Sequence, residues 1–451
     1  MRTYRTRTLA RTVAALAGAS MLLTACGAGE SSSTAGSGGG SAQPTGGGSG
    51  DTTGITDTSI KIGTHMLLTG VAAPGYSNIP TGAKAYFDHV NANGGVHGRT
   101  IEYVVRDDGY NPSNTSQVTN QLVLQDEIFG MLGGLGTPTH SAVVEFLNEE
   151  SVPDLFVSSG ALAWNQKEKY PSSFGWQPNY EVEGKIVGQY IAENFPDAKI
   201  GLFLQGDDFG RDGAKGAEQF LKDQVVSRAT YTPGNTDVGP QVAQLQADGA
   251  DFVLGFNVPA YTALSQLVAQ RLNYKPKWFY SNVGSDVSLV GALLDNFSKG
   301  AIKGGGLLNG IYTTKYLPTV EEPDNPWTQK FDEIWKANGG SSEPLNNFRI
   351  YGMSQAYTLV AALQAAGKDV TRESLVKTIE DKGAQFQGPW LAPFDYAADS
   401  HRGISGVQVV QVKGTATEKL SEILTTDSDD APIEPSSSKP STPDEDGIPN
   451  A

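Results

Sequence analysis

Residues 128–160 read IFGMLGGLGTPTHSAVVEFLNEESVPDLFVSSG, and their pattern predicts a strand, a turn, a helix and a second strand. The apolar run Ile128–Leu132 has the length of a short buried strand and leads into a glycine-rich turn. Apolar residues then recur at helical spacing between Ala142 and Leu147. Pro153 favours an extended backbone before it, and the run Leu155–Val157 reads as the next strand.

Hydroxyl side chains stand where this helix is expected to begin and where the second strand stops. Thr137 precedes Pro138, which is the arrangement expected of a helix N-cap. A helix N-terminus favours an anion, and ligands of open parallel sheets bind beyond the carboxyl ends of the strands. We therefore expect Thr137, Ser158, Ser159 and Gly160 to hold one small anionic group. The alternative is that Thr137 only caps its helix.

The N-terminus has the pattern of an export signal. Four arginines and no acid occupy the first 25 residues, and the apolar stretch Val13–Leu23 is too short to span a membrane. The following sequence Leu-Thr-Ala-Cys resembles a bacterial lipobox, in which the cysteine is acylated. We interpret residues 1–25 as a lipoprotein signal peptide and Cys26 as the lipidated first residue. The alternative is a secretory signal followed by a free thiol.

Composition sets apart both ends of the remaining chain. Residues 26–57 are rich in Gly and Ser and are predicted to form a flexible tether. Residues 426–451 are rich in Asp, Glu, Ser and Pro and are predicted to be disordered. The formal charge of −16 for the whole sequence becomes more negative without the arginine-rich signal, which argues against a nucleic-acid partner.

Strands and helices alternate twice along the folded part. The first series starts at the alternating strand near Ser59, and the second starts near Glu181 and reaches Asn282. Three more helices are expected before a terminal hairpin between Gly388 and Val412. Such alternation predicts an α/β fold with parallel, doubly wound sheets, and 451 residues suffice for two domains.

The motifs of common enzymes are absent from the sequence. It contains no G-x-S-x-G elbow, phosphate-binding loop, dinucleotide fingerprint or H-E-x-x-H, and its five histidines share no metal-ligand spacing. Asp107-Asp108 and Asp207-Asp208 each follow a strand, where they are expected to cap turns and helices. We therefore expect no catalysis, no cofactor and no metal; a hydrolase using Asp207 or Asp208 is the remote alternative.

An ordered set of short motifs resembles the branched-chain amino-acid binding proteins of ABC importers. The motifs are Leu68-Thr69-Gly70, Asn91–Arg99, Asp107-Asp108 and Asp207–Gly210, and the resemblance spans about residues 59–413. It implies two Rossmann-like lobes that are joined by a three-crossing hinge and close on a ligand. The implied ranges are residues 58–179 and 313–387 for lobe 1, and residues 180–312 and 388–425 for lobe 2.

The same resemblance implies a set of ligand-binding residues. Lobe 1 would hold a carboxylate through Thr137, Ser158, Ser159 and Gly160, with Tyr76 as an aromatic wall and Gln177 facing the cleft. In lobe 2 the family's amino-acid binders place a tyrosine at Phe209, another near Asn257, and a carboxylate for the ligand's ammonium at about Asn282.

The second half of that site departs from the family pattern. A neutral Asn282 cannot pair with a buried ammonium, and leaving an ammonium unpaired costs on the order of several kcal/mol. The nearest acid, Asp286, reads as the start of a helix. We therefore expect the ligand to be a small carboxylate or other polar solute, aromatic ones included, rather than an α-amino acid.

Together these features predict a lipid-anchored, extracytoplasmic solute-binding component of an ABC importer. We expect a monomer that captures a small-molecule solute, either a carboxylate or an amino-acid-like compound, and delivers it to ABC permease subunits. The alternative is a sensory lipoprotein that binds a ligand and reports to a membrane receptor.

Overall fold

The computed structural model describes residues 50–450 apart from residues 71, 303 and 340–342. The predicted signal peptide, Cys26 and most of the predicted tether therefore lie outside the described residues. Among the residues it does describe, no helix is both long and apolar enough to cross a membrane.

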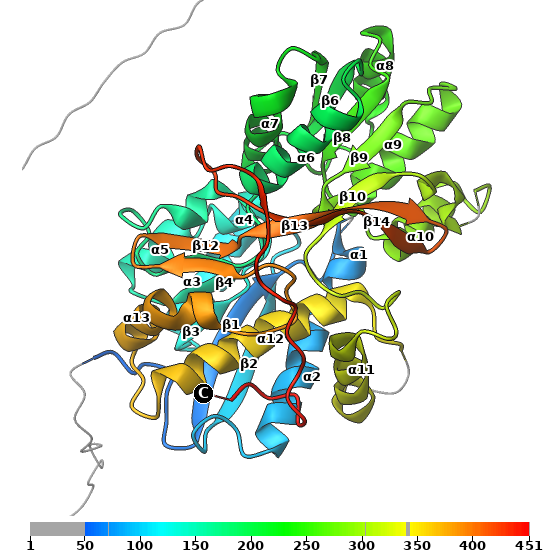
Figure 1. Ribbon diagram of the computed structural model, residues 1–451. Coiled ribbons are helices and arrows are strands. Elements are labelled where there is room, and N and C mark those ends of the chain that lie inside the picture. Colours follow the sequence, from blue (N-terminus) through cyan, green and yellow to red (C-terminus); the bar gives the residue numbers. More distant parts are fainter. Residues whose placement is uncertain (1–49, 71, 303, 340–342, 451) are drawn as a thin grey trace, which may run out of the picture. The chain divides into compact units, whose positions relative to one another are not determined.

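Two sheets organise the described chain, and we call each sheet with the elements packed on it a lobe (Figure 1). The sheet of lobe 1 is parallel and has the strand order β2-β1-β3-β4-β5. Its strands are β1 (Ser59–Met66), β2 (Thr100–Asp107), β3 (Gly130–Leu132), β4 (Asp154–Val157) and β5 (Ser173–Gly175).

The sheet of lobe 2 has the order β15-β14-β13-β10-β9-β8-β6-β7, parallel from β7 to β10 and antiparallel beyond. Its strands are β6 (Ile200–Gln205), β7 (Val225–Tyr231), β8 (Phe252–Phe256), β9 (Lys277–Tyr280), β10 (Tyr312–Lys315), β13 (Gly406–Lys413), β14 (Ala416–Thr425) and β15 (Glu434–Pro435). The parallel pairing in both lobes confirms the predicted α/β class.

Helices cover both faces of each sheet, as doubly wound folds require. Those of lobe 1 are α1 (Ala73–Tyr76), α2 (Ile79–Ala92), α3 (Pro112–Leu124), α4 (Thr137–His140), α5 (Val144–Glu149), α11 (Pro326–Asn338), α12 (Asn347–Ala366) and α13 (Arg372–Lys382). Those of lobe 2 are α6 (Tyr180–Asn194), α7 (Asp208–Leu221), α8 (Gly239–Ala247), α9 (Pro259–Arg271) and α10 (Val287–Phe297). Short 3-10 turns are η1 (Leu162–Asn165), η2 (Asn282–Gly284), η3 (Gly304–Leu308) and η4 (Gly383–Gln385).

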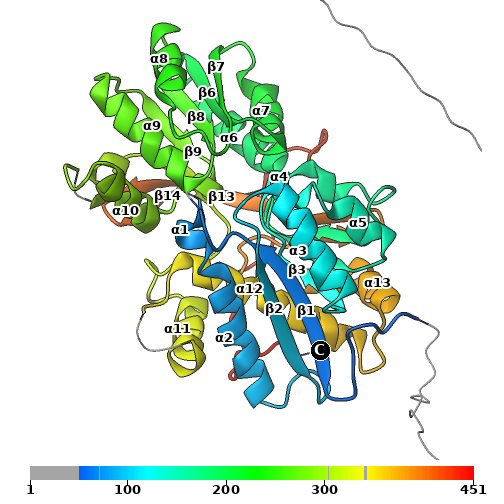
Figure 2. The same cartoon turned by 180° about the vertical axis from the view of Figure 1, so that it is seen from behind.

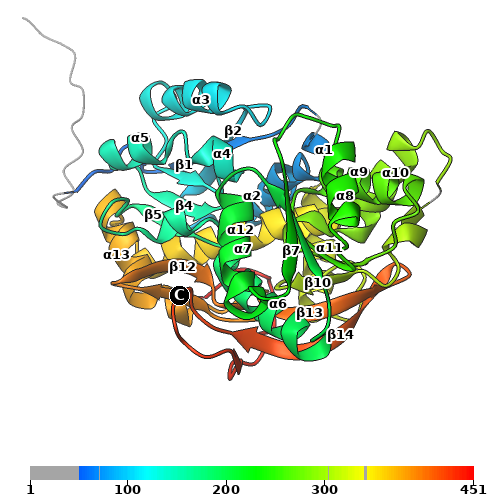
Figure 3. The same ribbon diagram turned by 90° about the horizontal axis from the view of Figure 1, so that it is seen from above.

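The views agree on which helices cover which face. In lobe 1, α12 and α2 pack together on one face of the sheet (Figure 1), and α3 covers the other (Figure 2). In lobe 2, α6 and α7 lie side by side, with β13 and β14 along another side of the lobe (Figure 3). Strands β3, β4, β6 and β8 are buried along their whole length, which is why their sequences read as largely continuous apolar runs.

Strand pairing moves two of the predicted lobe boundaries. β10 pairs with β9 and β13, so residues 313–315 belong to lobe 2 rather than lobe 1. The predicted terminal hairpin is two hairpins, and the first of them, β11 (Phe394–Ala397) with β12 (Ser400–Ile404), packs on β5 and α13 of lobe 1. The chain therefore crosses to lobe 2 for the last time near Ser405, not at residue 388.

The prediction of a disordered acidic tail was wrong for residues 426–450. The segment begins beside lobe 2, where Lys185 donates to the carbonyls of Asp429 and Ala431. It then runs along lobe 1 (Figure 1), where the Trp327 indole donates to Ser441 O and the Tyr86 hydroxyl donates to Gly447 O. Composition missed this because few apolar residues such as Ile433 and Ile448 pack on the core, while backbone carbonyls of the tail accept hydrogen bonds from the folded body.

Candidate functional site

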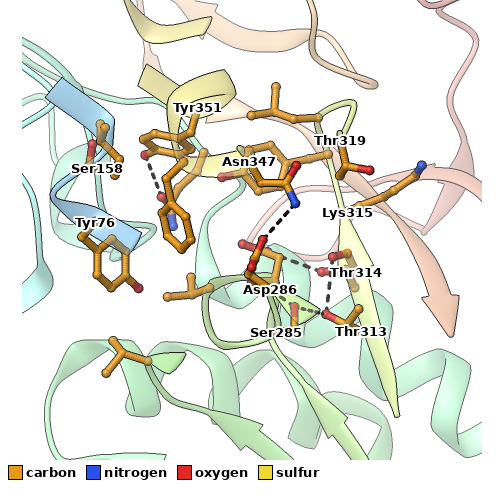
Figure 4. Close-up of a pocket in the computed structure, with 18 of the residues that line it drawn as sticks. Tyr76, Ser158, Ser285, Asp286, Thr313, Thr314, Lys315, Thr319, Asn347 and Tyr351 are labelled. Carbon is orange, nitrogen blue, oxygen red and sulfur yellow. Dashed lines mark hydrogen bonds between the residues drawn. The ribbon is translucent and has the colours of Figure 1, made fainter. Parts of the chain in front are cut away.

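A cavity of about 200 Å³ opens between the two lobes, beyond the carboxyl ends of the strands of lobe 1. Figure 4 shows residues from both lobes around it, with Tyr76, Ser158 and Tyr351 on one side and Asp286, Thr313 and Thr314 on another. This position, at strand ends and between lobes, is where ligands bind in open α/β sheets.

Six of the nine predicted site residues line this cavity: Tyr76, Thr137, Ser158, Gln177, Phe209 and Asn282. Ser159, Gly160 and Asn257 lie behind its wall. Ser159 contacts the cavity only through Thr137, and the Gly160 carbonyl accepts the Tyr180 N–H at 2.7 Å. Asn257 is fully buried and donates to the Thr262 hydroxyl, while its neighbour Val258 takes the place in the wall.

Thr137 is the first residue of its helix and not its N-cap, so that prediction was wrong. Gly136 is the N-cap, with φ at 101°, a backbone conformation that glycine adopts without strain. The predicted single helix is also two short ones, α4 and α5. Because α4 has only four residues, few peptide dipoles add at its N-terminus. An anion bound there would be held by the Thr137 hydroxyl rather than by the helix dipole.

The hydroxyl of Thr137 belongs to a small cluster at the lobe 1 end of the cavity. It lies 2.8 Å from the Ser159 hydroxyl and 3.5 Å from that of Tyr180. Burial raises the pKa of Tyr180 to about 12, against the opposing hydrogen bond from Thr137. The Tyr180 hydroxyl therefore keeps its proton at neutral pH and can donate it to an anion.

A second polar group is anchored by α12. Gln355 donates to the Phe156 carbonyl at 2.8 Å and to the Ser158 hydroxyl at 2.9 Å. One turn earlier on the same helix, the Tyr351 hydroxyl donates to Gln177 Oε1 at 3.1 Å. The side chains of Ser158, Tyr351 and Gln177 are thus held in place at the cavity wall.

Aromatic rings that the sequence reasoning missed form much of the remaining wall. Tyr110, Tyr180, Phe348 and Tyr351 join the predicted Tyr76 and Phe209. Tyr110 and Tyr180 follow β2 and β5 closely, so the rule of strand ends that selected Thr137 could have found them. Phe348 and Tyr351 lie on a helix, and the sequence carries no signal for which helix face meets a cavity.

On the lobe 2 side, Asn282 lines the cavity, as predicted. The buried carboxylate of Glu183 lies behind it. Glu183 of α6 is 0% exposed and accepts from the Asn282 N–H at 2.8 Å and the Ser281 hydroxyl at 2.7 Å, with Thr314 as a third donor. Burial raises the pKa of Glu183, and these hydrogen bonds oppose that rise. All its described contacts are internal, so Glu183 shapes the wall rather than facing the cavity.

Like Glu321, Asp286 is a carboxylate that lines the cavity. It caps α10 as predicted, with Oδ1 accepting from the Leu289 N–H at 2.7 Å. Its Oδ2 accepts from Asn347 of α12 at 2.9 Å, so the pair also connects lobe 2 to lobe 1 (Figure 4). The prediction that the site lacks a partner for an ammonium rested on Asn282 alone, whereas Asp286 is an acid that lines the same cavity.

Of the paired acids at the ends of β2 and β6, Asp107, Asp108 and Asp207 act as caps, as predicted, and Asp208 does not. Asp107 accepts from the N–H groups of Leu68 and Gly109, and Asp207 accepts from the N–H of Phe209 at the start of α7. Asp208 pairs with Arg211 on the same helix. Within the described part of the chain, no cluster of three or more His, Cys, Asp or Glu side chains could hold a metal ion.

Comparison with known proteins gives one family match, and it covers most of the chain. Residues 59–418 match the model of the family described as "periplasmic binding protein". Among curated relatives, Leu/Ile/Val-binding protein homolog 1 of Brucella suis is 23% identical over 330 residues, which is 72% of this chain and 83% of the relative.

Solved structures share the fold at similarly low identity. A branched-chain amino-acid ABC transporter protein from Thermus thermophilus with bound valine has a TM-score of 0.72 at 21% identity, covering 83% of this chain and 98% of its own. A fatty acid ABC transporter substrate-binding protein from Thermomonospora curvata also has a TM-score of 0.72, at 22% identity, covering 84% and 95%. These relatives and neighbours are substrate-binding proteins and not enzymes.

Proposed function

Because the chain belongs to the periplasmic binding protein family, we propose that it is the extracytoplasmic solute-binding component of an ABC importer. Its ligand is a small solute with a carboxylate and an apolar body, trapped between the lobes by hinge closure. Cys26, outside the described residues, is the proposed lipid anchor, and permease subunits are the proposed partners.

The observation that carries this proposal is the contrast between the two parts of the cavity wall. Neutral hydroxyls of Thr137, Ser158 and Tyr180 gather at the lobe 1 end, and they can donate to a carboxylate. Aromatic rings such as Tyr76 and Phe209 cover part of the remaining wall and favour an apolar body. An isolated carboxylate needs several such donors to leave water.

Asp286 decides between two classes of solute at this site. Its Oδ2 has Asn347 as a neutral partner, so an ammonium placed there would gain a charge-assisted hydrogen bond. A carboxylate without an amine would gain nothing from Asp286. The mismatch at Asn282 favours the carboxylate without an amine, and the fatty-acid-binding neighbour shows that this fold is compatible with such ligands.

The test is a thermal-shift screen of residues 50–451, because a ligand that binds the folded state raises its melting temperature. The panel sets leucine, isoleucine and valine beside their deaminated acids of equal chain length, benzoate and the corresponding amides. We expect shifts with acids that lack the amine. Shifts confined to the amino acids would overturn the argument from Asn282, and shifts confined to amides would remove the carboxylate from the proposal.

The anchor and the importer role need separate experiments. Metabolic labelling with a fatty-acid probe should label the full-length protein and fail with Cys26→Ser. Cross-linking in membranes should capture permease subunits; capture of a receptor kinase instead would favour the sensory alternative.

A further inference from the structure

Two buried histidines lie beneath the glycine-rich turn Gly133–Gly136, and the solute site does not use them. His65 of β1 and His140 of α4 are both 0% exposed, and their rings meet edge to edge, with centroids 5.3 Å apart and an interplanar angle of 19°. Asp108 and Asp154, also 0% exposed, lie at the two ends of the pair. We call these four side chains the acid–histidine chain.

Three contacts join the acid–histidine chain. His65 Nδ1 lies 2.9 Å from Asp108 Oδ2, and His65 Nε2 lies 3.0 Å from His140 Nδ1. His140 Nε2 lies 2.8 Å from Asp154 Oδ2. Each distance is that of a hydrogen bond, so each contact needs one hydrogen between its two heavy atoms.

The elements packed around the two rings supply acids and neutral donors. The groups that face them are Asp108 and Tyr110 from the loop after β2, Thr115 of α3, Asp154 of β4, Ser173 of β5 and Trp164 of η1. The Tyr110 N–H and the Thr115 hydroxyl donate to Asp108, and the Ser173 hydroxyl donates to Asp154. Asp154 Oδ1 is buried without a hydrogen-bond partner.

The hydrogens in this chain can be counted. Two neutral imidazoles supply one N–H each, and two ionised carboxylates supply none. Three contacts need three hydrogens, so the chain holds one proton more than two neutral imidazoles would. That proton lowers the charge of the four groups from −2 to −1, which a dry interior favours.

We propose that the acid–histidine chain binds this third proton at neutral pH and positions the Gly133–Thr137 turn at the cavity wall. His65 itself is an unfavourable place for the proton, because burial lowers its pKa.

The turn packs directly against the two rings. A Cβ at position 134 would come within 2.5 Å of His140 Nδ1 and 2.6 Å of His65 Nε2, so only glycine fits there. The Leu135 N–H donates to the His65 carbonyl, and Leu135, Gly136 and Thr137 then line the cavity. A change in the spacing of the rings would therefore move residues that face the solute. Their role is positioning, since neither ring reaches the cavity.

Asp154→Asn is the variant that removes the need for the extra proton but keeps the three hydrogen-bonded contacts. An asparagine amide can donate to His140 Nε2, after which His140 Nδ1–H serves His65 and His65 Nδ1–H serves Asp108. All three contacts are then made with the two imidazole hydrogens and one amide hydrogen, and the net charge is again −1. This variant should fold, keep the turn in place and bind no third proton.

The first measurement is the pH dependence of urea unfolding between about pH 7.5 and 8.5, where histidines of the unfolded chain are neutral. One proton bound only by the folded state makes the unfolding equilibrium constant rise tenfold per pH unit. The unfolding equilibrium constant of the unaltered protein should therefore rise ten times more per pH unit than that of Asp154→Asn. Equal pH dependences, or failure of Asp154→Asn to fold, would overturn the proposal.

The second measurement is hydrogen exchange of the Leu135 and Gly136 amides, with His401→Gln as the matched control. His401 is another buried histidine of lobe 1, bonded to the Ser173 carbonyl and to Glu380 rather than to a member of the acid–histidine chain. Exchange should be at least tenfold faster in His140→Leu and unchanged in Asp154→Asn and His401→Gln. Unchanged exchange in His140→Leu would remove the positioning role, and if that variant does not fold, the pH measurement alone decides. Neither measurement needs a solute, so both stand apart from the proposed function.

Discussion

Replacing Glu183 should weaken the packing of α6 against β10 and the segment after β9 within lobe 2, and change how stability depends on pH. Glu183 sits in the first turns of α6, where the chain enters lobe 2, and its carboxylate accepts three hydrogen bonds from the segments after β9 and in β10. In Glu183→Ala the hydroxyls of Ser281 and Thr314 can rotate toward other acceptors, but the Asn282 N–H cannot turn away.

The size of the effect follows from those three bonds. A buried donor left without a partner costs about 1–3 kcal/mol, and each hydrogen bond to a charged group contributes about 1.5–3 kcal/mol. Removing the buried carboxylate also removes its own desolvation cost, which offsets part of the loss. We expect Glu183→Ala to lose about 2–4 kcal/mol of unfolding free energy. Glu183→Gln, which keeps the volume and a carbonyl acceptor, should lose about 1 kcal/mol.

The pH dependence gives a second, independent signature. Burial raises the pKa of Glu183 in the folded state, so the folded protein holds this proton to higher pH than the unfolded chain does. The stabilisation that protonated Glu183 gives the folded state is fully present below the unfolded pKa of about 4.3. It is lost as pH rises through the folded pKa of Glu183. Both variants should lack this fall in stability on the alkaline side of pH 4.3.

The assay is urea unfolding followed by circular dichroism at half-unit steps from pH 4 to 8. The matched control is Glu181→Gln, whose parent residue is equally buried on the same helix but pairs with Lys215. If Glu183→Ala and Glu183→Gln had the same stability and the same pH profile as the unaltered protein, the role assigned to the buried carboxylate would be refuted.

Three further predictions concern the cavity and the tail. Thr137→Val and Ser158→Ala should each weaken binding of the carboxylate found in the screen by about tenfold, since each removes one hydrogen bond of about 1–1.5 kcal/mol; isothermal titration measures this. Ser141→Ala is the control, because that hydroxyl donates only to a backbone carbonyl of α4, and an equal loss there would contradict the assignment. Asp286→Asn should leave binding of amine-free carboxylates within about threefold but weaken any amino-acid ligand by about 30-fold or more, as expected for a charge-assisted pair of about 2–3 kcal/mol. Ending the chain after Thr425 should lower the melting temperature by about 2–4 °C in calorimetry, because Tyr86 and Trp327 lose backbone acceptors; an unchanged melting temperature would mean that the packed tail contributes no net stability.

Much of the candidate site was predictable because the relevant signals are local. Thr137 and Ser158 follow short apolar runs, and a residue just beyond a parallel strand lies at the ligand-binding edge whatever the rest of the chain does. The family resemblance placed Tyr76, Gln177 and Phe209, which also line the cavity. Capping by Asp107 and Asp207 was predictable for the same reason, since a cap involves residues two or three positions apart.

Apart from the local N-cap at Thr137 and the division of its helix into α4 and α5, the errors concern contacts between distant segments. Asp286 reads correctly as a helix cap, but its contact with Asn347 joins residues 61 positions apart. The tail reads as unable to bury a core, but Tyr86 donates to a carbonyl 361 positions away. Neither contact leaves a periodicity or a spacing in the sequence.

The sequence by itself determined the alternation of strands and helices, and with it the parallel sheets and the edge where a ligand binds, because those properties follow from patterns within about 15 residues. Only the tertiary structure decided which helix residues complete the cavity and which histidines share a proton. His65 and His140 are 75 positions apart and show no motif spacing. Folding brings them to 3.0 Å because the end of β1 lies beside α4 and Gly134 leaves room for both rings.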